Sequence, residues 1–77
     1  MSRAQQIIDG LGGADNIEEI EGCITRLRTD VRDASLVDDR ALKAAGATAV
    51  VHAGGSVQVI VGTIADSLAE DINDLLP

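Results

Sequence analysis

The first hydrophobic pattern along the chain is that of a helix. Apolar residues three and four positions apart share one helical face: Ala4, Ile7, Ile8 and Leu11. Ser2 followed by Gln5 fits a capping box at the start of this helix. The Gly12–Gly13 pair is typical of a helix end, so the pattern predicts a helix that stops before it.

Two later stretches have the same spacing. Asp38 is predicted to cap a second helix, with Val37 packing on Leu42 as a hydrophobic staple, and Gly46 ends it. A last helix is predicted to begin with Thr63 as its cap. Its apolar stripe would be formed by Ile64, Leu68, Ile72 and Leu75.

Alternation of polar and apolar residues predicts a strand over residues 25–32, where Leu27 and Val31 share the apolar face. Residues 16–22 form a weaker strand pattern, because their apolar members repeat every three positions. These two segments follow one another closely, so we expect them to pair as a hairpin.

A second hairpin is predicted further along. Two runs rich in β-branched residues, 49–53 and 57–61, flank Gly54-Gly55-Ser56, and glycine supplies the positive φ angles of a tight turn. The order is therefore helix, hairpin, helix, hairpin, helix within one domain spanning residues 1–77. Helices with a single apolar stripe cover one face of a sheet. We expect an α+β fold, a four-stranded antiparallel sheet with three helices packed on one face.

Composition excludes several functions. The 77 residues carry a net charge of -7 and include no Phe, Tyr or Trp. An acidic domain repels a phosphate backbone and has no aromatic platforms for bases, so nucleic acid is not the expected partner. No apolar run approaches the roughly 20 residues of a membrane span, and no membrane insertion is expected.

One cysteine and one histidine cannot form an intramolecular disulfide or a zinc cage, and no metal or cofactor is predicted. The free thiol indicates a reducing compartment, and the chain start lacks the layout of a secretory signal. These features predict a cytoplasmic location.

Positive charge is concentrated in one segment. Residues 22–32 hold three arginines against Asp30, a local charge of +2, so the rest of the chain carries -9. Arg26 and Arg28 share a strand face about 7 Å apart, a spacing at which two guanidinium groups can share one phosphate-sized anion. A solvated polar strand face is the alternative. Arg32, Arg40 and Lys43 are interpreted as solvated charges.

Cys23 lies beside this positive patch. Nearby guanidinium groups favour the thiolate, which is the nucleophilic form of cysteine. Thr25 offers a hydroxyl donor, and backbone N–H groups in the turn after Cys23 could form a small anion cradle. The combination suits a cysteine that attacks phosphorus and then holds the phosphoryl group.

Other cysteine chemistries fit less well. A cysteine-dependent phosphatase needs an arginine six residues after the cysteine, but position 29 is Thr29. A single cysteine excludes Cys-x-x-Cys redox chemistry. A Cys–His pair would have to use His52, which the strand alternation predicts to be a surface residue.

The run Glu21-Gly-Cys-Ile-Thr-Arg-Leu-Arg28 resembles the active-site signature of the IIB domain of the bacterial phosphoenolpyruvate-dependent sugar phosphotransferase system, glucose family. Residues 12–17, 43–46 and 57–62 resemble further segments of that family in the same order. The resemblance implies the same antiparallel sheet with helices on one face.

The resemblance also implies a phosphoryl relay without a cofactor or metal. Cys23 would accept a phosphoryl group from a phosphohistidine of the IIA partner. It would then donate this group to a hexose, N-acetylglucosamine or glucose, held by the membrane transporter IIC, which recruits the domain to the inner face of the membrane. Arg26 and Arg28 would neutralise the phosphoryl oxygens, Thr25 and the backbone at Ile24 would hydrogen-bond them, and Gln58 would lie near the partner surface.

Two points stay open at this stage. Glu21 stands where some relatives have aspartate, and its carboxylate would either face Cys23 or attract basic groups of a partner. The alternative function is a regulatory docking module that binds partners without phosphoryl transfer. The intact Cys-x-Thr-Arg-Leu-Arg sequence favours the phosphotransferase, because a docking module has no need of a thiol beside two arginines.

Overall fold

A computed structural model describes residues 2–77. Within this range the chain forms three α-helices and four strands. In chain order these are α1 (Arg3–Gly10), β1 (Ile17–Cys23), β2 (Arg26–Val31), α2 (Asp39–Ala44), β3 (Ala49–Ala53), β4 (Ser56–Ile60) and α3 (Ala65–Leu75). The predicted order of helices and hairpins is confirmed.

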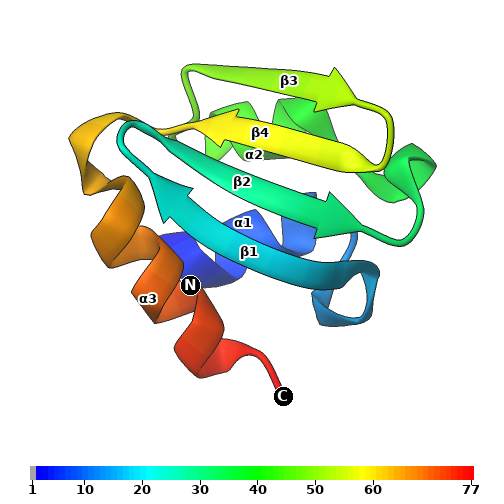
Figure 1. Cartoon of the computed structure of the whole chain (residues 1–77), viewed down its shortest axis with the longest axis horizontal. Coiled ribbons are helices and arrows are strands. Elements are labelled where there is room, and N and C mark those ends of the chain that lie inside the picture. Colours follow the sequence, from blue (N-terminus) through cyan, green and yellow to red (C-terminus); the bar gives the residue numbers. More distant parts are fainter. Residues whose placement is uncertain (1) are drawn as a thin grey trace.

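The four strands form one antiparallel sheet in the order β1-β2-β4-β3, so each hairpin contributes one central and one edge strand (Figure 1). Helix α3 packs against β1 and β2, α2 packs against β3, and α1 contacts both other helices. The helices lie on one side of the sheet and leave its other face open (Figure 1). The α+β fold expected from the sequence is confirmed.

The core lies between the sheet and the helices, and it is built from aliphatic side chains. Its largest fully buried apolar members are Ile7, Leu11, Leu27, Leu42, Val57, Val59 and Ile72. Strand alternation places one set of side chains in this core and sends the other set to the open face. Polar and charged residues of β1 and β2 therefore share a solvated surface.

The first two helix caps are confirmed. Ser2 accepts a hydrogen bond from the backbone N–H of Gln5, at 3.1 Å, and Asp38 accepts one from Ala41, also at 3.1 Å. Strand β1 pairs with β2 from Ile17 to Cys23, with one register shift between Ile17 and Glu19, although its apolar period is irregular. Pairing with β2 and packing on α3 override its weak local pattern.

The predicted cap of the last helix is wrong. Thr63 lies in a 3₁₀ turn (Gly62–Ile64), and α3 begins at Ala65 with no side-chain cap. The turn begins at Gly62, which has φ +82°, and the helix starts one residue later than predicted. The buried face shifts accordingly: it consists of Ala65, Leu68, Ala69 and Ile72. Ile64 and Leu75, predicted to be core, are 39% and 50% exposed.

Asn16 ties two loops together in a way the sequence did not reveal. Its amide donates to the carbonyls of Leu11, at 2.7 Å, and Asp33, at 3.0 Å, and its Oδ1 accepts the N–H of Asp33 at 2.9 Å. Asp33 in turn accepts hydrogen bonds from the hydroxyl and the N–H of Ser35, which hold the pKa of Asp33 below its usual range. The end of α1 is thus fastened to the connection between β2 and α2.

Thr29 has a fully buried hydroxyl without a hydrogen-bond partner among residues 2–77. We predict that Thr29→Val raises the free energy of unfolding by about 1 kcal/mol, because valine has nearly the same shape and removes an unsatisfied polar group. Chemical denaturation would measure the change. Thr48→Val, at an exposed position, is the control and is expected to change stability by less than about 0.5 kcal/mol. A destabilised Thr29→Val would contradict the prediction.

Candidate functional site

The candidate site is built on the hairpin that joins β1 to β2. Cys23 ends β1 and lies directly opposite Arg26, the first residue of β2, so Ile24 and Thr25 alone form the turn. Ile24 has φ +55° and is 83% exposed. A β-branched residue rarely adopts this left-handed conformation, and such strain concentrates at functional sites. The thiol of Cys23 is itself exposed beside this turn.

Two contacts fix the hairpin on the rest of the fold. The carbonyl of Thr25 accepts the N–H groups of Val61, at 3.0 Å, and Gly62, at 2.9 Å, so the turn is held by the connection between β4 and α3. Gly22 packs so closely on the start of α3 that a Cβ atom there would lie 2.9 Å from the Cα of Asp66. The backbone on both sides of Cys23 is therefore held in place by the β4–α3 connection and the start of α3.

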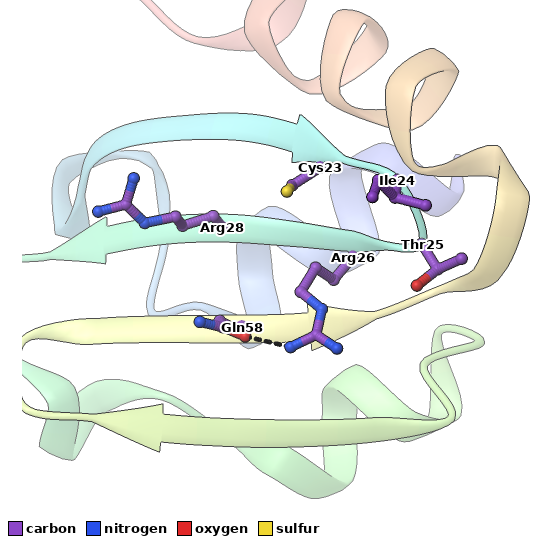
Figure 2. A pocket seen from close by; sticks show the side chains of 6 residues that line it. All are labelled: Cys23, Ile24, Thr25, Arg26, Arg28 and Gln58. Carbon is purple, nitrogen blue, oxygen red and sulfur yellow. Dashed lines mark hydrogen bonds between the residues drawn. The ribbon is translucent and has the colours of Figure 1, made fainter.

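The open face of the sheet brings the predicted site residues together. Arg28 lies opposite Gln58 of β4. Arg26 lies two residues nearer the turn on the same face of β2. One shallow pocket on this face is lined by all six predicted residues, namely Cys23, Ile24, Thr25, Arg26, Arg28 and Gln58 (Figure 2). Thr25 belongs to the turn, whereas the alternation pattern had assigned it to the strand.

Each arginine of the pocket is held by a neighbouring strand. Arg26 donates from Nη1 to Oε1 of Gln58 on β4 (Figure 2). Arg28 donates from Nη1 to Oε1 of Glu21 on β1, at 3.0 Å. Both guanidinium groups remain on the open face with further N–H donors, and this arrangement can bind an anion beside the thiol.

The contact of Glu21 resolves a point left open by the sequence. Its carboxylate pairs with Arg28, and this partner was not foreseen. A two-residue turn after Cys23 makes Glu21 face Arg28 by simple counting along the strands, so the hairpin itself carried the signal.

His52 is exposed, as predicted, and takes no part in the pocket. Its neighbour Val51 pairs with Gln58 on the open face, so His52 points to the opposite side, where its Nε2 lies 2.7 Å from Oδ1 of Asp39. Within residues 2–77 no three His, Cys, Asp or Glu side chains come together as candidate metal ligands. In the same range, no helix has the length and apolar character needed to cross a membrane.

The fold and this cysteine-bearing hairpin point to a family of phosphotransfer proteins. The family model described as phosphotransferase system, EIIB, matches residues 5–38. The chain is 59% identical over 75 residues to the PTS system N-acetylglucosamine-specific EIIB component of Streptomyces coelicolor, and the match covers 97% of both chains. The chain belongs to the EIIB family of the phosphotransferase system.

Two further similarities extend this result. The chain is 49% identical over 67 residues to the PTS system N-acetylglucosamine-specific EIICB component of Bacillus subtilis, of which it spans only 15%. A crystal structure of one domain of the PTS system IIabc component from Clostridium difficile has a TM-score of 0.75 and 29% identity. That match covers 94% of this chain and 73% of the other.

Proposed function

We propose that this domain relays a phosphoryl group through Cys23, from a phosphohistidine of an EIIA partner to a sugar held by an EIIC transporter. The observation that carries the proposal is the gathering of an exposed thiol, two arginines and the strained turn in one pocket, in a chain of the EIIB family. The domain would work in the cytoplasm, at the inner face of the membrane.

The first step forms a bond between phosphorus and the sulfur of Cys23 as the phosphorus–nitrogen bond of the phosphohistidine breaks. The thiol proton ends on the leaving imidazole. In the second step a sugar hydroxyl attacks phosphorus, the phosphorus–sulfur bond breaks, and the hydroxyl proton returns to the thiolate. Both steps balance without another reactant.

Neutralisation of charge is the main task of the protein in such a transfer. Arg26 and Arg28 stand on the same face as the thiol and would bind the equatorial oxygens of the phosphoryl group. Thr25 and the backbone of the turn would add hydrogen bonds. The shallow pocket lies open to solvent, so partner surfaces must exclude water from the phosphocysteine.

N-acetylglucosamine is the sugar we propose. Relatives at 59% and 49% identity carry this specificity in their names, and the first has almost the same length as this chain. The second relative is named as an EIICB component, which supports an EIIC partner for this domain as well.

Reconstitution of the relay tests the proposal. Labelled phosphoenolpyruvate, the general phosphotransferase proteins and a cognate EIIA are expected to label this domain on Cys23, and membranes with EIIC are expected to release the label as sugar phosphate. Absence of label while EIIA is demonstrably charged would contradict the proposal and favour a docking module that carries no phosphoryl group.

Replacement of either arginine by lysine separates the two steps. Arg26→Lys or Arg28→Lys is expected to slow transfer to the sugar by about 10²-fold and to reduce acceptance from EIIA far less. Lysine keeps the charge but loses the planar fork that binds a strand neighbour and a phosphoryl oxygen together. Rates of labelling and of sugar phosphate release measure the steps separately.

Arg32→Lys is the matched control for these variants, because Arg32 is exposed and lies outside the pocket. It is expected to leave both rates unchanged. Equal loss of acceptance and donation in the variants of Arg26 and Arg28 would refute the division of labour.

A further inference from the structure

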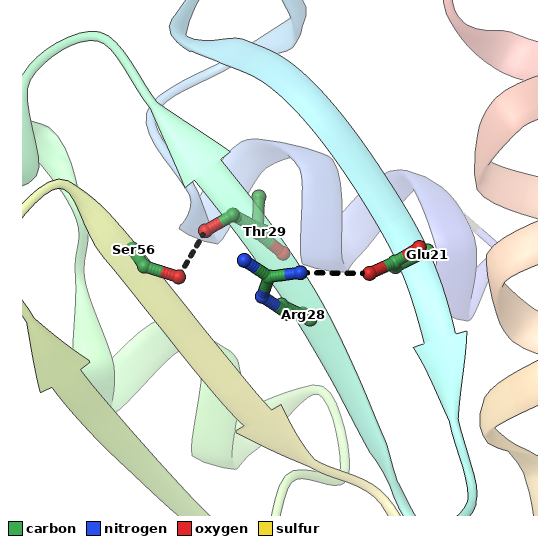
Figure 3. Close-up of polar contacts among 4 residues, drawn as sticks. All are labelled: Glu21, Arg28, Thr29 and Ser56. Carbon is green, nitrogen blue, oxygen red and sulfur yellow. Dashed lines mark hydrogen bonds and ion pairs between the residues drawn. The ribbon is translucent and has the colours of Figure 1, made fainter.

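The two arginines of the pocket have different partners. Arg26 is held by Gln58, which is neutral, whereas Arg28 is held by Glu21, which is charged (Figure 2 and Figure 3). Among residues 2–77, an ion pair therefore already balances the positive charge of Arg28 in the unphosphorylated domain, whereas Arg26 forms none. An incoming phosphoryl group meets one free cation and one engaged cation.

The register of the hairpin places Arg28 near both Glu21 and Cys23. Glu21 and Cys23 are two residues apart on β1 and face the same side of the sheet, which separates them by about 7 Å. Arg28 lies opposite Glu21 and diagonal to Cys23. A guanidinium on a flexible stem can turn from the carboxylate to a phosphoryl group on the sulfur without any movement of the backbone.

The pair can exchange because it is weak. Its side chains are 56% and 54% exposed, and solvent-exposed ion pairs contribute little to stability. A phosphoryl group brings more charge than a carboxylate and three acceptor oxygens, so it competes well for the same guanidinium.

We propose that Glu21 is a positioning residue that competes with the phosphoryl group for Arg28. This inference rests on the proposed function, because it requires a phosphocysteine at position 23. Glu21 holds Arg28 when the thiol is free and weakens the grip of Arg28 on the phosphoryl group. The competition prevents Arg28 from stabilising the phosphocysteine too strongly and favours transfer of the phosphoryl group to the sugar.

The equilibrium of phosphoryl exchange between EIIA and this domain tests the inference. Glu21→Gln frees Arg28, so the equilibrium is expected to shift toward phosphocysteine by about two- to five-fold, the range of an exposed ion pair. Release of label to the sugar is expected to slow correspondingly. A purely structural role would leave the equilibrium unchanged.

Glu19→Gln is the matched control. Glu19 lies on the same strand and is exposed, but it faces Asp30, so its replacement makes the same change in charge without touching Arg28. This variant is expected to retain the wild-type equilibrium. An equal shift in both variants would overturn the inference, because it would then reflect net charge alone.

A double-mutant cycle shows whether Glu21 acts through Arg28. In an Arg28→Gln background, Glu21→Gln is expected to have no further effect on the equilibrium. If Glu21→Gln had its full effect in that background, Glu21 would act by repelling the phosphoryl group directly. That result would overturn the inference that Glu21 competes for Arg28. If wild-type domain takes label but Glu21→Gln behaves as wild type, this inference fails alone, whereas an unlabelled wild type removes the proposed function as well.

Discussion

Replacing Cys23 by serine is expected to abolish stable phosphorylation of this domain and to lower sugar phosphorylation by at least about 10³-fold. A serine hydroxyl stays protonated near neutral pH and is a far weaker nucleophile than a thiolate. Because Cys23 is exposed at the end of β1, the substitution is expected to change the free energy of unfolding by less than about 0.5 kcal/mol.

Chemical modification provides an independent control. Cys23 is the sole cysteine of the chain, so alkylation blocks the same thiol without a mutation. Alkylated wild type and Cys23→Ser should both remain unlabelled by charged EIIA, while untreated wild type takes label. Normal sugar phosphorylation by either form would show that the phosphoryl group travels by another route.

Asn16→Ala is expected to lower the free energy of unfolding by about 3 kcal/mol, the largest stability effect predicted for this fold. Asn16 is 3% exposed, and its three side-chain hydrogen bonds satisfy backbone groups of Leu11 and Asp33. Alanine would leave those groups without partners in a region that water enters poorly. Thermal unfolding would show a midpoint lower by about 10–20 °C.

Asn73→Ala is the matched control for this stability effect. Asn73 is an exposed asparagine whose amide also donates to two backbone carbonyls, those of Ile20, at 3.3 Å, and Ala69, at 3.0 Å. Water can replace those bonds, so the loss is expected to stay below about 1 kcal/mol. Similar losses in both variants would show that burial is not what makes Asn16 important.

Local signals in the sequence predicted most of this fold. Ser2 and Asp38 cap helices within a few residues of themselves, and Gly54-Gly55 turns a hairpin between two β-branched runs. Thr63 failed as a cap because the connection from β4 first makes a 3₁₀ turn, which is stabilised by a contact with distant Thr25. A local pattern cannot register such a contact.

In the candidate site, too, the local sequence predicted some features, whereas others depend on contacts between distant residues. Five of the six residues that line the pocket were predicted because they lie close together in one signature, and Gln58 was predicted from the family resemblance. The strained backbone of Ile24 and the partner of Glu21 became visible only with the register of the hairpin. Asn16 was missed because two of its three hydrogen bonds join it to Asp33, 17 positions along the chain.

The two-residue turn limits how many partners can bind at the thiol of Cys23 at one time. A thiol at the tip of a short, firmly seated hairpin presents one small contact area, and under the proposed relay both donor and acceptor must cover it. They cannot do so together. The domain would then be phosphorylated by one protein, dissociate, and pass the phosphoryl group on at another. An excess of unphosphorylated donor would slow this transfer by occupying the hairpin.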